Sequence, residues 1–197
     1  MTTCESIADL ARTVVDELIE SGMAVATAES CTGGWIAKSL TDVAGSSAAF
    51  GYGIVSYSNG AKEQMLGVSH ARLTEHGAVS EAVVSEMAEG ALNLSGANIA
   101  VGVSGVAGPE GGTDEKPVGT VWFAWARRTD AGVMIDTDLQ TFDGDRKSVR
   151  MQTVTHALNG IRDRLRARRH TMVVPKSARA RPSPPEHAKS WGSRPGT

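Results

Sequence analysis

The order of helical and extended segments along this 197-residue chain predicts a three-layer α/β/α sandwich with a mixed, mostly parallel sheet of about five strands. Two observations predict that class. Short runs of small and apolar residues alternate with amphipathic helices through most of the chain, a pattern typical of parallel sheets. The last connections between extended segments are too short for helical crossovers, so those strands must pair antiparallel.

The helices are predicted from apolar residues at three- and four-residue spacing and from residues that cap helix ends. Thr2 and Glu5 form a candidate capping box for the first helix, and Gly22 stops it. Ser80 caps a later helix, which Gly96 ends. In chain order the predicted helices cover Ile7–Ile19, Trp35–Val43, Ala61–Leu66, His70–His76, the segment between Ser80 and Gly96, and a long segment from its cap Asp145 through Leu165.

The strands are predicted from short runs of small, β-branched and aromatic residues between turn residues. Asn59 and Gly60 end the second strand, and the turn 129–132 joins the last two. Trp122 and Trp125 lie three residues apart in one strand, so they face opposite sides of the sheet, and we expect both to be covered. The predicted strands are Ala24–Ala28, Gly51–Tyr57, Asn98–Val106, Thr120–Arg127 and Val133–Phe142.

The composition is that of an ordinary globular protein, with 41% hydrophobic and 21% charged residues. No apolar run is long enough to cross a membrane and no signal peptide is evident, so we expect a cytoplasmic protein without a membrane partner. The two cysteines, Cys4 and Cys31, allow at most one disulfide and form no CxxC pair. Neither a disulfide scaffold nor a zinc site is therefore predicted.

The chain divides into a domain over residues 1–169 and a Pro- and Arg-rich tail over 170–197, which we expect to be disordered. Five of the seven prolines lie in the tail, and its ionisable residues sum to a net charge of +4. Because the whole chain carries −2, the remainder carries −6. An acidic body argues against nucleic acid as the main partner.

A polar turn follows the first predicted strand, where Ser30 and Cys31 precede Gly33 and Gly34 at the start of a helix. Ligands of open α/β sheets bind at the carboxyl ends of strands. A helix start offers unpaired N–H groups and partial positive charge. A nucleophile, an oxyanion site and an anion site can therefore share this turn.

Several common site motifs are absent. The chain has no GxxxxGK[ST] phosphate loop, no complete dinucleotide-binding glycine pattern and no HExxH, and no GxSxG surrounds Ser30. The five histidines are scattered, which disfavours a Ser–His–Asp triad. We therefore expect neither a metal nor a cofactor.

Four longer segments occur in a fixed order: AESCTGG, GIVSYSNGAKEQMLGV, SGVAGPEGGTDEKPVGTVWFAW and FDGDRKSVR. Together they closely resemble the CinA C-terminal domain family, over about Ile7 to Leu165. The resemblance implies an amidase that converts nicotinamide mononucleotide to nicotinate mononucleotide and ammonia. It also implies Ser30 as the nucleophile, with Lys62 and Arg146 as further residues of the active site.

The residues themselves leave alternatives for these roles. Ser30 could cap a helix, but Thr32 is better placed to cap a helix that begins at Gly33. Cys31 is the rival nucleophile or a buried core residue, and it should not share a face with Ser30. Lys62 serves as the base if its pKa is lowered, and otherwise it is a solvated lysine. Tyr57 relays a proton, stacks on the pyridinium ring or simply packs.

Substrate contacts are predicted at two loops and one helix start. The segment from Cys31 through Thr32 and Gly33 to Gly34 offers N–H groups to an oxyanion. Glu29 either orients Lys62 or caps locally. Arg146 lies in a first helical turn, where a cation costs about 0.3–1 kcal/mol unless an anion such as phosphate offsets it. The loop Ala107–Pro117 and the end of the strand before it offer backbone N–H groups for phosphate or ribose through Gly105, Gly108, Gly111, Gly112 and Thr113.

Two other functions are compatible with these features. A non-catalytic nucleotide-binding module would keep the glycine loop and Arg146 and bind without turnover. A scaffold would use the basic tail to contact nucleic acid or another protein. For all three functions we expect a homo-oligomer, because a small domain with apolar helices favours self-association.

Overall fold

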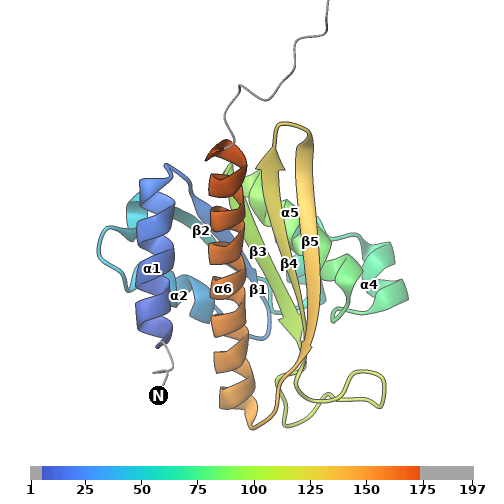
Figure 1. Ribbon diagram of the computed structural model, residues 1–197. Helices are drawn as coiled ribbons and strands as arrows, with labels where there is room; N and C mark the ends of the chain where they lie inside the picture. The colour runs from blue at the N-terminus through green and yellow to red at the C-terminus, as the bar shows by residue number, and fades with distance from the viewer. Residues whose placement is uncertain (1–5, 174–197) are drawn as a thin grey trace, which may run out of the picture.

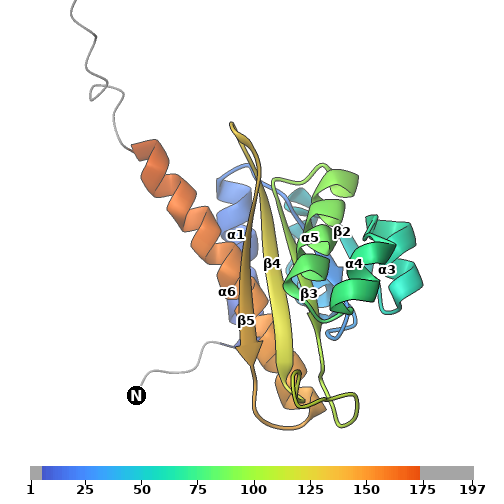
Figure 2. The same cartoon turned by 90° about the vertical axis from the view of Figure 1, so that its right-hand side faces the viewer.

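The computed structural model describes residues 6–173 and forms three layers. Figure 2 shows the sheet edge-on, with α1 and α6 on one side and α3, α4 and α5 on the other. The helices are α1 (Ile7–Glu20), α2 (Trp35–Thr41), α3 (Asn59–Leu66), α4 (His70–His76), α5 (Glu81–Ser95) and α6 (Arg146–Val173), with a short 3-10 helix at Ser46–Ala48. The predicted fold class is confirmed.

The sheet has five strands in the order β2-β1-β3-β4-β5 (Figure 1). The strands are β1 (Val25–Glu29), β2 (Phe50–Val55), β3 (Ile99–Gly105), β4 (Thr120–Thr129) and β5 (Gly132–Thr141). β1 pairs parallel with β2 and β3, whereas β4 pairs antiparallel with β3 and β5. Every strand except β4 therefore points the same way, and the carboxyl ends of β1, β2, β3 and β5 lie at one end of the sheet.

The two faces of the sheet differ in side-chain size. Towards α1, α2 and α6 the strands present larger residues such as Ile99, Phe123 and Trp125. Towards α5 they present mostly alanine and glycine. A Cβ at Gly102 would lie 2.7 Å from the Val84 carbonyl oxygen, so α5 packs directly on the backbone of β3. Trp122 and Trp125 face opposite layers, as predicted, and Trp125 is fully buried.

Several element ends differ from the predicted ones. α1 begins after Ser6, whose hydroxyl accepts a hydrogen bond from the Asp9 N–H at 3.1 Å. Ser6 is therefore the N-cap of α1, and the prediction of a capping box from Thr2 and Glu5 is wrong. Those two residues lie outside the described part of the chain. Asn59 and Gly60 form the first turn of α3 instead of only ending a strand. α6 extends to Val173, into the predicted tail, and the rest of that tail lies outside the described residues. No helix within residues 6–173 has the length and apolarity needed to cross a membrane.

Candidate active site

The Ser30–Gly34 turn leaves the sheet between two neighbouring strands. The Ser30 N–H donates to the Val103 carbonyl of β3 at 3.1 Å, which extends the strand pairing by one residue. The Gly33 N–H then donates back to the Ser30 carbonyl at 3.0 Å. Gly33 and Gly34 have φ values of +61° and +91°, which other residues rarely adopt. The two glycines therefore turn the chain sharply and leave Ser30 directly after the end of β1.

Glu29, the last residue of β1, caps α2. Its buried carboxylate accepts hydrogen bonds from the N–H groups of Ile36 at 3.0 Å and Ala37 at 2.8 Å. The prediction that Thr32 caps α2 is wrong. The N-cap residue is Gly34, which has no side chain to form a capping bond. The buried Thr32 hydroxyl has no hydrogen-bond partner among the described residues. Of the two roles predicted for Glu29, the structure shows the local cap.

Glu29→Gln is expected to lower the free energy of unfolding by about 1–3 kcal/mol, because one amide oxygen cannot replace two carboxylate acceptors of buried N–H groups. Urea unfolding followed by circular dichroism measures the change. Glu63→Gln is the control, because Glu63 pairs with the exposed His70 and its loss should cost under about 0.5 kcal/mol. Equal midpoints for the two variants would contradict the cap.

Lys62 meets Ser30 inside the protein. Ser58 caps α3, so Lys62 lies in the first turns of that helix with its side chain directed inward. Its Nζ donates to the Ser30 Oγ at 3.2 Å and to the Ser56 carbonyl at 2.8 Å, and the residue is only 1% exposed. Burial lowers the pKa of Lys62, because desolvation disfavours the ammonium form. The alternative of a solvated lysine is therefore wrong.

Arg146 joins the loops that follow β2 and β3. Its Nη2 donates to the Tyr57 hydroxyl and its Nη1 to the Gly108 carbonyl, each at 2.8 Å. Asp145 caps α6 as predicted, since its carboxylate accepts from the Ser148 N–H at 2.8 Å. Tyr57 thus lies against Arg146, while Lys62 contacts Ser30 directly, so no tyrosine is needed between them. Tyr57 is 59% exposed, and stacking of its ring on a substrate ring stays a prediction.

A cavity of about 500 Å³ adjoins this arrangement at the start of α6. Its lining includes Arg146, Lys147 and Arg150 but neither Ser30 nor Lys62. Arg150 links the cavity to the nucleophile turn, because its Nη2 donates to the Thr32 carbonyl at 2.6 Å. Sequence reasoning missed Arg150, although its spacing of four from Arg146 places both on one face of α6. The lining residues are Ala107, Gly108, Pro109, Val118, Gly144, Asp145, Arg146, Lys147 and Arg150.

The predicted glycine loop contributes less than expected. Only Gly108 lines the cavity and contacts Arg146. Gly105 is required by packing, since a Cβ there would lie 2.7 Å from the Thr120 carbonyl oxygen, and at Gly112 it would lie 2.9 Å from the Val118 nitrogen. The Thr113 hydroxyl accepts from the Lys116 N–H at 3.0 Å and so stabilises its own turn. Ligand contacts for Gly105, Gly111, Gly112 and Thr113 stay predictions.

Cys31 belongs to the core between the sheet and helices α1, α2 and α6. It is 5% exposed, and burial raises the pKa of its thiol to about 12. A thiol with that pKa stays protonated near neutrality and is a poor nucleophile. Of the two roles weighed for the side chain, the structure supports the buried core residue, and only the backbone of Cys31 belongs to the turn.

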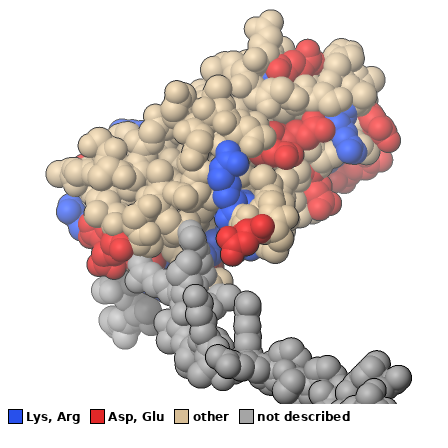
Figure 3. All heavy atoms as spheres, turned by 90° about the horizontal axis from the view of Figure 1, so that it is seen from above, with Lys and Arg blue, Asp and Glu red and all other residues tan. Residues whose placement is uncertain are grey.

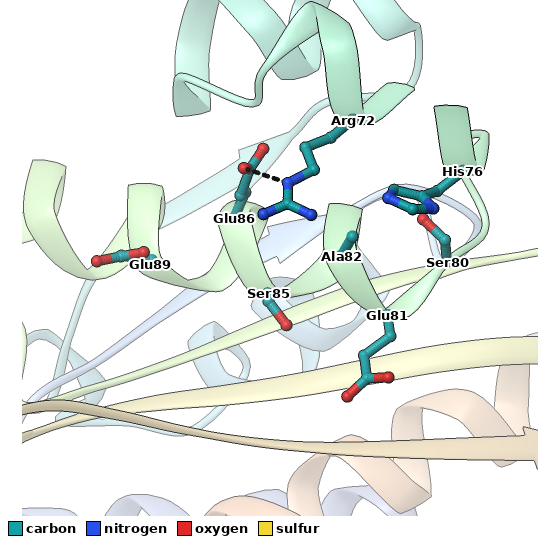
Figure 4. A pocket seen from close by; sticks show the side chains of 8 residues that line it. All are labelled: Arg72, His76, Ser80, Glu81, Ala82, Ser85, Glu86 and Glu89. Carbon is teal, nitrogen blue, oxygen red and sulfur yellow. Dashed lines mark ion pairs between the residues drawn. The ribbon is translucent and has the colours of Figure 1, made fainter. Parts of the chain in front are cut away.

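A second cavity, of about 550 Å³, lies on α4 and α5 away from the predicted residues (Figure 4). Glu86 in its wall already bonds the Ser69 N–H and pairs with Arg72, and Glu81 accepts from Thr137. His70 and His76 belong to α4 and not to the Ser30 turn. Among the described side chains of residues 6–167, no three His, Cys, Asp or Glu gather as metal ligands.

Comparisons with known proteins identify the family and agree with the fold. The family model for the CinA C-terminal domain matches residues 7–165. The chain is 53% identical over 156 residues to "Nicotinamide-nucleotide amidohydrolase PncC" of Escherichia coli K12, covering 79% of this chain and 93% of that protein. It is equally identical over 156 residues to a "CinA-like protein" of Akkermansia muciniphila, of which it covers 37%.

Solved structures show the same fold. A CinA superfamily protein from Klebsiella pneumoniae superposes with a TM-score of 0.77 at 42% identity, covering 82% of this chain and 99% of that one. The "competence/damage inducible protein CihA" from Agrobacterium tumefaciens gives 0.75 at 46% identity, covering 81% and 95%. The match spans every element from α1 to most of α6, and the chain therefore belongs to the CinA C-terminal domain family.

Proposed function

We propose that this protein is a nicotinamide-nucleotide amidohydrolase, which converts nicotinamide mononucleotide to nicotinate mononucleotide and ammonia. The observation that carries the proposal is the buried contact between Lys62 Nζ and Ser30 Oγ beside an arginine-lined cavity. Relatives that share about half of their residues with this chain bear the name of that activity.

The reaction begins with proton transfer from the Ser30 hydroxyl to the neutral amine of Lys62. The Ser30 oxygen attacks the carboxamide carbon, and the resulting tetrahedral intermediate places negative charge on the former carbonyl oxygen. Lys62 returns the proton to the nitrogen as the carbon–nitrogen bond breaks, so ammonia leaves. Water then gives a proton to Lys62 and attacks the ester, which releases the acid and restores Ser30.

Backbone N–H groups of the turn stabilise the oxyanion in this mechanism. The Gly33 N–H is already used, because it donates to the Ser30 carbonyl. The Cys31, Thr32 and Gly34 amides donate to no backbone carbonyl of the described residues. Of the four residues predicted to bind the oxyanion, we therefore propose that these three supply the N–H groups.

The arginine-lined cavity suits the substrate phosphate. Arg146 and Lys147 bring two positive charges to its wall against one carboxylate, Asp145, and Arg150 lines the same wall with its Nη2 bonded to the Thr32 carbonyl. Arginine binds phosphate through paired N–H groups, and a phosphate there would offset the cost of cations in the first turn of α6. Tyr57, held by Arg146, would then lie beside the substrate ring.

An ammonia assay on the purified protein tests the function, with nicotinamide mononucleotide, its riboside and free nicotinamide as substrates. We expect the mononucleotide to have the highest kcat/KM, because only it carries the phosphate. Binding of the mononucleotide without ammonia release would favour the non-catalytic nucleotide-binding module instead. Equal kcat/KM for the mononucleotide and the riboside would contradict the proposal that the cavity binds the substrate phosphate.

Self-association through the free edge at β2 is the second part of the proposal. Tyr52 and Val55 on this edge strand and Met65 on the adjoining α3 are 43–48% exposed. Exposed apolar groups on an edge strand favour pairing with a second copy. Sedimentation should find a homo-oligomer that Tyr52→Glu dissociates, whereas Leu94→Glu, at an apolar site on α5 that is 55% exposed, should leave it intact. A monomeric wild type would refute this part.

The scaffold role is tested through the tail. Figure 3, seen from the end where α6 leaves the sheet, shows described basic side chains interspersed with acidic ones, which is not the continuous basic surface that nucleic acid requires. Deleting residues 174–197 should leave ammonia release unchanged. Loss of activity in that truncated protein would show that the tail is required for ammonia release.

A further inference from the structure

We propose that Arg150 is a positioning residue that holds the Ser30–Gly34 turn in its reactive shape from across the domain. The inference rests on the proposed amidase function, and it adds a residue outside the predicted set. Arg150 lies on α6, 118 positions after the Thr32 whose carbonyl it binds. The turn is thus fixed by a contact with a distant part of the chain.

The turn has few hydrogen bonds of its own. One backbone bond, from the Gly33 N–H to the Ser30 carbonyl at 3.0 Å, closes it, and the Trp35 N–H reaches the Thr32 carbonyl only at 3.4 Å. Two of its five residues are glycines, whose backbones are the least restricted of any residue. The Arg150 bond to Thr32, at 2.6 Å and charge-assisted, is the shortest of these contacts.

The Arg150 guanidinium contacts two positions of this segment and lies beside a third. Its Nη2 bonds the Thr32 carbonyl and lies 3.4 Å from the point where a Cβ of Gly33 would stand. Its central carbon lies 5.5 Å from the centre of the Trp35 ring, a cation–π distance. A planar guanidinium can make these contacts together, whereas a lysine ammonium supplies only a point charge.

These contacts fix the amides that the oxyanion needs. The Thr32 carbonyl and the Gly33 nitrogen belong to one peptide group, and the Gly34 amide follows one residue later. Turning the Thr32 carbonyl away from Arg150 would rotate the Thr32–Gly33 peptide plane and displace the amides on either side. The oxyanion forms only during the reaction. Loss of the Arg150 contact should therefore lower kcat and leave KM nearly unchanged.

A phosphate-binding role would give a different result. Arg150 also lines the cavity assigned to the phosphate, next to Arg146. A residue that binds phosphate would change KM for the mononucleotide and leave the riboside unaffected. A residue that positions the turn would lower kcat for both substrates by the same factor.

The experiment compares Arg150→Ala and Arg150→Lys with Arg166→Met, the matched control. Arg166 also extends from α6 to another element, bonding Glu17 of α1 at 2.9 Å, but it lies far along the helix from the turn. We expect both Arg150 variants to lose about 10²-fold in kcat on each substrate, with KM within about threefold. Added methylguanidinium should partly restore Arg150→Ala, and Arg166→Met should keep the wild-type kcat. A rise in KM for the mononucleotide alone, with kcat preserved, would overturn the proposal.

Hydrogen exchange separates this inference from the function itself. If the wild type releases no ammonia, the proposed function fails, but the turn can still be observed. The amides of Gly33, Ile36 and Ala37 are hydrogen-bonded in and after the turn and should exchange faster in Arg150→Ala than in wild type. Unchanged exchange at these amides would refute the positioning role whether or not the protein is an enzyme.

Discussion

Ser30→Ala is expected to lower ammonia release from nicotinamide mononucleotide by roughly 10⁴-fold or more, because the variant loses the attacking oxygen. Within the described residues, the Ser30 hydroxyl is the part of the turn that forms a hydrogen bond with Lys62. An unactivated amide reacts too slowly with water for the remaining groups to compensate. A coupled ammonia assay at saturating substrate measures the loss, and thermal unfolding should show an intact fold.

The matched control is Ser39→Ala. Ser39 is a buried serine of α2 whose hydroxyl donates within its own helix, to the Trp35 carbonyl at 2.8 Å. It should keep the wild-type kcat. Cys31→Ala should also keep most of the activity, because its thiol is protonated and faces the core. Activity that survives in Ser30→Ala and disappears in Cys31→Ala would reverse the assignment of the nucleophile.

Lys62→Met is expected to reduce kcat/KM by about 10³-fold or more, because methionine has a similar length but cannot accept the Ser30 proton. In the wild type the reactive form of Lys62 is the neutral amine. Burial lowers its pKa below the ordinary lysine value of 10.5, so activity should rise with pH towards that lowered pKa and level off above it. The pH profile of kcat/KM measures this limb. A profile that falls as pH rises through that range would contradict Lys62 as the base.

The same pKa shift makes stability depend on pH. The unfolded chain binds the Lys62 proton up to about pH 10.5, while the folded protein releases it at a lower pH. In the window between the two values the unfolded state binds more protons, so the free energy of unfolding rises with pH. Lys62→Met should remove this rise. Lys38→Met, which replaces an exposed lysine of α2, should change neither the pH dependence of stability nor the activity.

The helices and strands could be predicted from the sequence better than the contacts that hold the candidate site. Asp145 was identifiable as a cap because its target lies three residues away. Thr32 was chosen as the cap of α2 for the same local reason, but the carboxylate of Glu29 reaches Ile36 and Ala37 from seven and eight positions away. The strand end and the helix start lie close in space only after the glycine turn forms. Sequence patterns over a few residues cannot predict that the strand end and the helix start lie close together.

Contacts between segments far apart in the sequence were harder still to predict. Lys62 and Ser30 were paired through the resemblance, and periodicity alone favoured a solvated lysine on a short helix. Tyr57 could not be assigned a partner, because its hydroxyl meets Arg146 across 89 positions of sequence. The role of Arg150 could not be predicted because its partner is a backbone carbonyl, and every residue type carries one. Its four-residue spacing from Arg146 was the available signal.

The most direct test of the central claim is to acid-quench the enzyme during turnover of nicotinamide mononucleotide and to map the acylated peptide by mass spectrometry. The account predicts that the substrate's acyl group is attached to Ser30 and that ammonia appears before the free acid. Acylation of Cys31, or steady ammonia release with no acylated protein at any quench time, would contradict it.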